Sequence, residues 1–316
     1  MRDVMESLQS NGEPTNPSQG PCKELRGVLV ELTNPRARIS RTETRGKPFS
    51  CLGELCWYLA QSNKLEFIRY YIRQYEESAD GDIVKGGYGP RLFSWREIDQ
   101  LENVIETLRT KQDSRQAVVQ LFDASDLAEG HKSVPCTCTL QFMLRSGRLH
   151  MVTSMRSNDA YIGLPHDIFC FTMLQEILAR TLSVELGVYK HAIGSLHLYD
   201  RNVEGAQQFL DEGIQSTTSP MPPMPPDDPW SAIQVMLTAE ETIRTGQPFD
   251  SVMIDAIDPY WADLIRLLQV YRFSKDNDCD RIGEVRGNMA SSTYDVFIDQ
   301  RLSECRKRLM ESHELA

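Results

Sequence analysis

The chain has 316 residues, of which 41% are apolar and 25% charged, and its formal net charge at pH 7 is −11. This composition is typical of a globular protein with a substantial core, and the negative charge disfavours binding to nucleic acid or to an anionic membrane surface. No apolar run approaches the ~18 residues of a membrane-spanning helix, and the first residues lack the apolar stretch of a secretory signal. We therefore expect a cytoplasmic protein whose partners include neither nucleic acid nor a membrane.

The apolar residues predict a mixture of strands and helices after a polar, Pro- and Gly-rich arm over residues 1–24. In chain order we expect a strand at Gly27–Leu32, helices at Leu52–Tyr75 and Ile98–Thr110, strands at Ala117–Phe122, Cys136–Leu144 and Leu149–Ser154, a long apolar helix at Asp167–Leu182, a strand at Leu196–Tyr199, and helices at Asn202–Phe209, Trp261–Tyr271 and Val296–Glu311. The clearest hairpin signal is Arg145-Ser-Gly-Arg148 between two of the strands. Strands before residue 200 and helices after it indicate an α+β fold.

A proline-rich segment, Ser219–Trp230, is the clearest linker-like stretch of the chain, because its prolines favour an extended backbone. We expect three parts along the sequence. They are a polar N-terminal arm (1–24), a main domain (25–260) and a helical C-terminal extension (261–316).

The chain has eight cysteines, and we expect them to be reduced, since disulfides are rare in a cytosolic protein of this size. Cys136 and Cys138 form a C-x-C pair without a second cysteine or histidine pair, so we expect no metal. Two readings of Cys136 remain open at this point. It is either a nucleophile at the tip of a strand or a small buried core residue.

A polar segment, Met155–Phe169, follows the predicted hairpin directly. Arg156 and Ser157 offer a planar cation and a hydroxyl at a strand end, which suits a phosphate but is also common on surfaces. Asp167 stands where we expect a helix to begin, so one interpretation of it is an N-cap.

Six sequence blocks stand out along the chain: GELCWYL (Gly53–Leu59), GGYGPRLFSW (Gly86–Trp95), DSRQAVV (Asp113–Val119), VPCTCTLQF (Val134–Phe142), MRSNDAYIGLPHDI (Met155–Ile168) and GSLHLYDRN (Gly194–Asn202). In this order they resemble the thymidylate synthase superfamily, which includes the deoxycytidylate and cytidylate 5-hydroxymethylases, and Phe249–Trp261 resembles it more weakly. The resemblance covers about residues 25–260. It implies a thymidylate-synthase-like catalytic domain with a mixed β-sheet and a long buried helix, to which the helical extension is added.

The resemblance also implies a role for individual residues. Cys136 matches the nucleophile that adds to C6 of a pyrimidine, which activates C5 toward the one-carbon unit of 5,10-methylenetetrahydrofolate. Water capture then gives a hydroxymethyl group, whereas hydride gives a methyl group. The other matches are Glu54 and Tyr88 in the active site, Arg156 and Ser157 at the phosphate, Arg115 donated across a homodimer interface, His197 and Tyr199 at the sugar 3′-hydroxyl, and Asp159 and Gly163 at the folate.

Asp167 occupies the position where the synthases carry an asparagine that pairs with uracil. Cytosine presents an acceptor at N3 and a donor at its 4-amino group, which is the reverse of uracil. A carboxyl group suits cytosine because it accepts from the amine and supplies or shares a proton at N3. The sequence therefore predicts hydroxymethylation of CMP or dCMP, and it leaves the choice between ribose and deoxyribose open.

Several positions depart from the synthase pattern. Gln116, Thr137 and Ser195 replace an arginine, a histidine and an aspartate, and the N-terminal phosphate loop has no clear counterpart. A basic residue among Arg36, Arg38 and Arg41 is one candidate to replace its arginine. Two alternative functions are a synthase that methylates dUMP and a catalytically silent nucleotide-binding relative, but Cys136 and Glu54 are both present, which disfavours the silent case.

Overall fold

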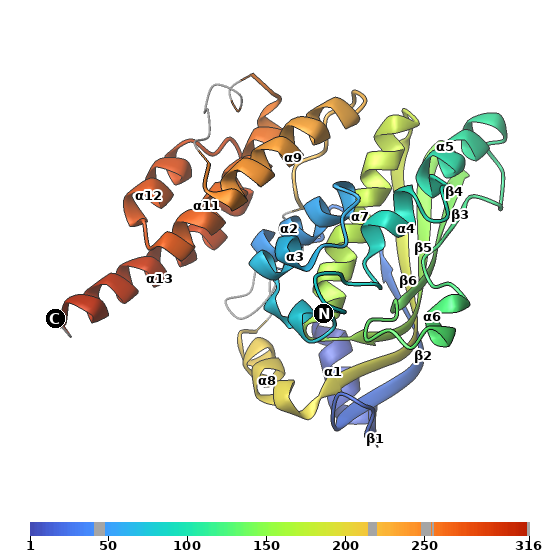
Figure 1. Ribbon diagram of the computed structural model, residues 1–316, viewed down its shortest axis with the longest axis horizontal. Helices are drawn as coiled ribbons and strands as arrows, with labels where there is room; N and C mark the ends of the chain where they lie inside the picture. Colours follow the sequence, from blue (N-terminus) through green and yellow to red (C-terminus); the bar gives the residue numbers. More distant parts are fainter. Residues whose placement is uncertain (41–47, 214–219, 248–253, 255, 315–316) are drawn as a thin grey trace.

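The computed structural model describes residues 1–40, 48–213, 220–247, 254 and 256–314 (Figure 1). Its elements are α1 (Arg2–Asn11), β1 (Glu13–Thr15), β2 (Cys22–Leu32), α2 (Pro48–Leu59), α3 (Leu65–Tyr71), η1 (Arg73–Glu76), α4 (Tyr88–Phe93), α5 (Gln100–Thr110), β3 (Val118–Gln120), α6 (Ser125–Ala128), β4 (Thr137–Arg145), β5 (Arg148–Asp159), α7 (Gly163–Thr181), β6 (Glu185–Tyr199), η2 (Asp200–Asn202), α8 (Val203–Asp211), α9 (Trp230–Thr245), α11 (Pro259–Asp276), α12 (Cys279–Gly287), η3 (Ser292–Tyr294) and α13 (Asp295–Glu314). No helix within these ranges is long and apolar enough to cross a membrane.

Among the described residues, six strands form one mixed sheet in the order β1-β2-β6-β5-β4-β3. β5 and β6 are parallel, and the other neighbours are antiparallel. The predicted hairpin is confirmed: Ser146 and Gly147 between β4 and β5 have φ of 49° and 71°, as a tight two-residue turn requires. The sheet and its helices confirm the predicted α+β class.

The core is centred on α7, which is buried along most of its length and packs between α2 and strands β5 and β6 (Figure 1). A helix that is apolar nearly all round is stable only when it is covered in this way. Buried and partly exposed residues alternate along the strands because successive side chains point to opposite faces. The partly exposed face contains a cross-strand row of Val118, Gln141, Val152 and Lys190.

The long helix begins four residues before its predicted start, at Gly163 rather than Asp167. Pro165 lies in the first helical turn, where the backbone needs no N–H donor, so this proline does not mark the start of the helix. The strand predicted at Leu196–Tyr199 is the end of the much longer β6, whose polar and glycine residues hid its pattern. The predicted helix Leu52–Tyr75 divides into α2, α3 and η1, and α9 and α12 were not predicted.

The N-terminal arm is folded, because α1 buries Met5 and Leu8 in a small second core that also includes Phe209 of α8. The expected boundary at residue 24 falls within β2, and the one at residue 260 falls within α11. The described part of the proline-rich segment is packed, with Met221 and Met224 buried. Neither boundary coincides with the end of a helix or strand, and the division into three parts stays a prediction.

Helices α9, α11, α12 and α13 form a C-terminal lobe beside α2 and α3 (Figure 1). Tyr271 of α11 stacks on Phe49 and Tyr71, so the lobe shares the main hydrophobic core. Cys279 and Cys305 form a disulfide that joins α12 to α13, with Cα atoms 5.9 Å apart. The expectation that all cysteines are reduced is therefore wrong for this pair, because the packing of the two helices brings their thiols together.

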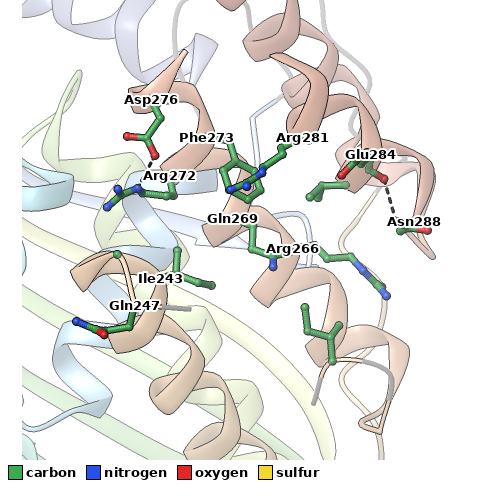
Figure 2. Close-up of a pocket in the computed structure, with 13 residues that line it drawn as sticks. Ile243, Gln247, Arg266, Gln269, Arg272, Phe273, Asp276, Arg281, Glu284 and Asn288 are labelled. Carbon is green, nitrogen blue, oxygen red and sulfur yellow. Dashed lines mark hydrogen bonds and ion pairs between the residues drawn. The ribbon is translucent and has the colours of Figure 1, made fainter. Parts of the chain in front are cut away.

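A cavity of about 720 Å³ lies within this lobe, between α9, α11 and α12 (Figure 2). Its polar walls include Arg272, which is paired with Asp276 on the next helical turn. None of the residues predicted for the nucleotide site lines this cavity.

Candidate active site

Cys136 precedes β4 and is anchored to β5, because its carbonyl oxygen accepts a hydrogen bond from the Arg156 backbone amide at 2.9 Å. The Arg156 guanidinium is 3.7 Å from the Cys136 Sγ, and two of its N–H groups donate to the carbonyls of Val134 and Pro135 at 3.0 Å. Burial raises the pKa of the Cys136 thiol, and the Arg156 charge opposes this rise. The structure thus places a cation beside the predicted nucleophile.

Tyr88, the first residue of α4, fixes the start of β4 next to Cys136. Its hydroxyl oxygen accepts hydrogen bonds from the Thr137 backbone amide at 3.2 Å and from the Thr137 hydroxyl at 3.0 Å. Burial raises the pKa of Tyr88 well above its ordinary value, so the phenol stays neutral. Tyr88 therefore lies in the site, where it holds the segment that carries the thiol.

Glu54 lies on α2 and is buried, with 4% of its surface exposed. Its Oε1 accepts hydrogen bonds from the hydroxyls of Tyr58 at 2.9 Å and Tyr75 at 2.5 Å. Tyr58 is one helical turn after Glu54, a spacing that places both side chains on the same helix face. The two hydroxyls satisfy one oxygen of a carboxylate that would otherwise be costly to bury.

Asp167 is inside α7 and is not its N-cap, because the helix begins at Gly163 with Ile162 at the cap position. Its Oδ2 accepts a hydrogen bond from Asn158 Nδ2 at 2.5 Å. Burial, and then the charge of Glu54, raise the pKa of Asp167 to about 8. This carboxyl group is therefore protonated at neutral pH and can donate as well as accept a hydrogen bond.

The register of the sheet brings the predicted phosphate and sugar residues together on one face. Ser157 of β5 lies opposite Ser195 of β6, and two residues further Asp159 lies opposite His197. Glu24 of β2 pairs with His197 from the other side, and its carboxylate accepts a hydrogen bond from the Ser195 hydroxyl at 2.5 Å. Directly opposite residues are neighbours, so His197 has an acidic residue next to it on each adjacent strand.

His197 and Tyr199 lie on the same strand and their rings meet edge to face, with centroids 4.8 Å apart. The Tyr199 hydroxyl donates to Gln19 Oε1 at 3.2 Å. His197 and Tyr199 thus place two polar groups at the end of β6. The Tyr199 hydroxyl is held by Gln19, in the loop that precedes β2.

Asp159 and Gly163, the residues predicted to face the folate, lie at the entrance to α7. Asp159 Oδ1 accepts hydrogen bonds from the backbone amides of Tyr161 at 2.7 Å and Ile162 at 3.0 Å, and no contact of Oδ2 is found among the described residues. A Cβ atom added at Gly163 would lie 3.7 Å from Asp167 Oδ2. The second Asp159 oxygen, beside a position without a side chain, can accept a hydrogen bond from a bound ligand.

Arg115 is the one predicted residue without a described contact to this cluster. Its side chain is exposed, and its carbonyl oxygen accepts a hydrogen bond from Gln141, which lies on the partly exposed face of the sheet. Among the three candidate replacements for the phosphate-loop arginine, Arg38 is buried in an ion pair with Glu176 and Arg36 donates to the Met221 carbonyl. Arg41 lies outside the described residues.

Sequence reasoning missed the residues that hold the others in place. Asn158 stands within a block quoted above but received no role, although it is the partner of Asp167. Tyr58 could have been found from its helical spacing to Glu54, whereas Tyr75 comes from a separate segment. His166, next to Asp167, contacts the Ser50 hydroxyl of α2 at 3.0 Å.

Comparison with known proteins identifies the family of the chain. The sequence profile of the family described as thymidylate synthase matches residues 41–225. The chain is also similar to the deoxyuridylate hydroxymethyltransferase of Bacillus phage SP01, with 31% identity over 212 residues. That similarity covers 62% of this chain and 55% of the phage protein, so the chain spans about half the length of that relative. Since the profile extends over more than half of the sequence, the chain belongs to the thymidylate synthase family.

Proposed function

We propose that the protein transfers a one-carbon unit to C5 of a pyrimidine nucleoside monophosphate, and that it hydroxymethylates the cytosine of CMP or dCMP. The observation that carries the choice of base is Asp167, a carboxyl group with a pKa raised to about 8 and held by Asn158 within the cluster around Cys136. A protonated carboxyl group donates to N3 of cytosine while its carbonyl oxygen accepts from the 4-amino group.

Cys136 is the proposed nucleophile, and the charge of Arg156 stabilises its thiolate form. The thiol pKa is raised by burial, so only a small fraction is ionised at neutral pH. The Arg156 charge favours the thiolate, and the thiolate adds to C6 of the pyrimidine. As the bond forms, negative charge develops on the ring, and Asp167 can neutralise it by giving its proton to N3.

The cofactor expected from family membership is 5,10-methylenetetrahydrofolate, which supplies the one-carbon unit when it is bound. Asp159, through its remaining oxygen, and Gly163 would hold its pterin. Glu54 is buried close to Asp167, and its carboxylate can orient a water molecule in the site. Addition of such a water to the one-carbon unit would give a hydroxymethyl product.

The second candidate is hydroxymethylation of a uracil nucleotide. It is supported by the name of the similar phage protein, which acts on deoxyuridylate. A neutral Asp167 can also pair with uracil, because its O–H can donate to O4 while its carbonyl oxygen accepts from N3–H. The two candidates differ only in the base.

The substitution Asp167→Asn distinguishes these candidates. An asparagine can donate a hydrogen bond to N3 but cannot transfer a proton to it, so the charge that develops on the ring is left without a proton donor. The loss of one such buried interaction costs about 1–3 kcal/mol. If cytosine is the substrate, the ratio of kcat/KM for cytidine over uridine monophosphates falls about 10- to 100-fold in D167N. An unchanged ratio would remove the reason for assigning cytosine, and a wild-type preference for uridine nucleotides would favour the second candidate.

We also propose a homodimer with shared active sites. The partly exposed sheet face carries Val118 and Val152 beside polar residues, which makes it suitable for burial against a second copy. Arg115 stands next to this face and makes no described contact with the site of its own chain. It can therefore bind the phosphate of a nucleotide in the active site of the partner subunit.

A further inference from the structure

A nucleoside monophosphate carries about two negative charges, and its binding requires cations near the sugar. The strands around His197 and Tyr199 carry few basic side chains that are free for this purpose. Lys23 donates to the Gln9 carbonyl, Arg26 pairs with Glu13, and Lys190 pairs with Glu31. Arg156 already divides its donors between two carbonyls and the Cys136 sulfur.

Carboxylates make this shortage of positive charge more severe. Burial, and then the charges of Glu24, Asp200 and Asp159, raise the pKa of Cys22, which lies directly opposite Tyr199. Three carboxylates therefore surround the end of β6, where the sugar is expected to bind. A phosphate dianion would be repelled there unless a second cation compensated for them.

Arg201 is a cation at the required place. Its guanidinium carbon lies 4.1 Å from the centroid of the Tyr199 ring, and its Nη1 donates to the Gln19 carbonyl at 2.7 Å. The side chain is exposed and makes no ion pair with any residue in the described part of the chain. It therefore stands over the ring whose hydroxyl is expected to meet the sugar, and no described carboxylate holds its guanidinium in a direct ion pair.

We infer that Arg201 is a phosphate-binding residue of the nucleotide site, in addition to Arg156 and to the partner's Arg115 proposed above. This inference rests on the proposed function, since it requires a nucleoside monophosphate between Ser157 and Tyr199. The 3′-hydroxyl and the 5′-phosphate belong to the same sugar and are a few bonds apart, within reach of one arginine side chain. Stacking on Tyr199 restricts the guanidinium before binding, which reduces the entropy lost when it contacts the phosphate.

The experiment measures binding by calorimetry for wild type, R201Q, R201K and a control, R281Q. Arg281 is an exposed arginine on α12 of the C-terminal lobe, its guanidinium carbon lies 5.4 Å from the centroid of the Phe273 ring, and it is paired with Asp278. The ligands are CMP, dCMP, UMP and dUMP, together with the nucleoside of the monophosphate that binds tightest. Thermal unfolding of each variant checks that the fold is retained.

We expect R201Q to weaken binding of the monophosphate about 10- to 100-fold, as the loss of a charge-assisted contact predicts. The affinity for the nucleoside should change by no more than about twofold, and R281Q should change both affinities by no more than about twofold. R201K should lie between wild type and R201Q because it keeps the charge but loses the planar fork.

Three results would overturn the inference. Equal losses for the nucleoside and the monophosphate would show that Arg201 only supports Tyr199. An equal loss in R281Q would show a general effect of surface charge, and unchanged binding in R201Q would exclude a phosphate contact. If wild type binds none of the four monophosphates, the proposed function fails as well, which distinguishes that outcome from a failure of Arg201 alone.

Discussion

Cys136 and Cys138 are two residues apart, but only Cys136 contacts Arg156. The two cysteines should therefore respond differently to replacement by serine. C136S should abolish product formation while nucleotide binding persists, because phosphate and sugar contacts remain. C138S should keep most of the activity. Product assays combined with nucleotide titration measure both effects, and the opposite behaviour of the two variants would mean that the nucleophile is Cys138.

The raised pKa values of Cys136 and Asp167 predict an unusual pH dependence. The active form has a thiolate at Cys136 and a proton on Asp167. Below pH 8 the thiolate fraction rises about tenfold per pH unit while Asp167 stays protonated, so kcat/KM rises. Above pH 8 the loss of the Asp167 proton offsets the gain in thiolate, so the profile becomes flat until the thiol itself is ionised.

The control for this profile is D167N, which has no titrating group at that position. Its residual kcat/KM should continue to rise through pH 8 with the thiolate fraction. Stopped assays between pH 7 and 9.5 in a constant-ionic-strength buffer measure the two slopes. Identical profiles for wild type and D167N would contradict the proton donation that we assign to Asp167.

At the level of single residues, the sequence was most informative where a motif carries the chemistry. Cys136, Arg156, Asp167 and Glu54 were predicted from motif blocks, and the structure brings their side chains together. Partners contributed by tertiary packing, such as Tyr75 for Glu54, could not be predicted. Such pairs depend on how separate segments fold onto one another, which no local pattern encodes.

At the level of elements, the disulfide between α12 and α13 is a testable feature of the C-terminal lobe. It closes a loop over a sequence separation of 26 residues, and its loss should lower the free energy of unfolding by about 2–4 kcal/mol. In urea unfolding, the free energy of unfolding of C279A/C305A should be lower than that of wild type by this amount. Wild type should show the same decrease only when a reductant is added. Thiol titration of the unfolded, unreduced protein should find the six free cysteines. Eight titratable thiols would contradict the bond.

Element types were predicted better than element ends. The hairpin of β4 and β5 was predicted correctly because its turn residues and its alternating strands agree. The start of α7 was misplaced because Pro165 lies inside its first turn, and most of β6 was missed because Lys190, His191 and Gly194 interrupt its apolar pattern. Gly194 is required by tertiary structure, since a Cβ atom there would lie 2.8 Å from the Arg156 carbonyl oxygen.

At the level of the whole molecule, the proposed shared site predicts complementation between subunits. C136S and R115A should each be inactive or nearly so as homodimers. After subunit exchange, a mixed dimer contains one site with both Cys136 and the partner's Arg115 intact. Activity should therefore recover to about a quarter of the wild-type value at equal mixing, because half of the dimers are mixed and each has one intact site. No recovery despite exchange, verified by mass spectrometry of the intact dimers, would contradict a shared site.

The central claim concerns the product, and one measurement tests it most directly. The protein is incubated with 5,10-methylenetetrahydrofolate and, separately, with CMP, dCMP, UMP and dUMP, and each nucleotide is analysed by mass spectrometry with C136S as the control. We predict that CMP or dCMP gains the mass of one formaldehyde unit, with the added group on C5 of the cytosine, and that C136S leaves every nucleotide unchanged. A gain of one methylene unit on dUMP, with both cytidine nucleotides unchanged, would contradict the account.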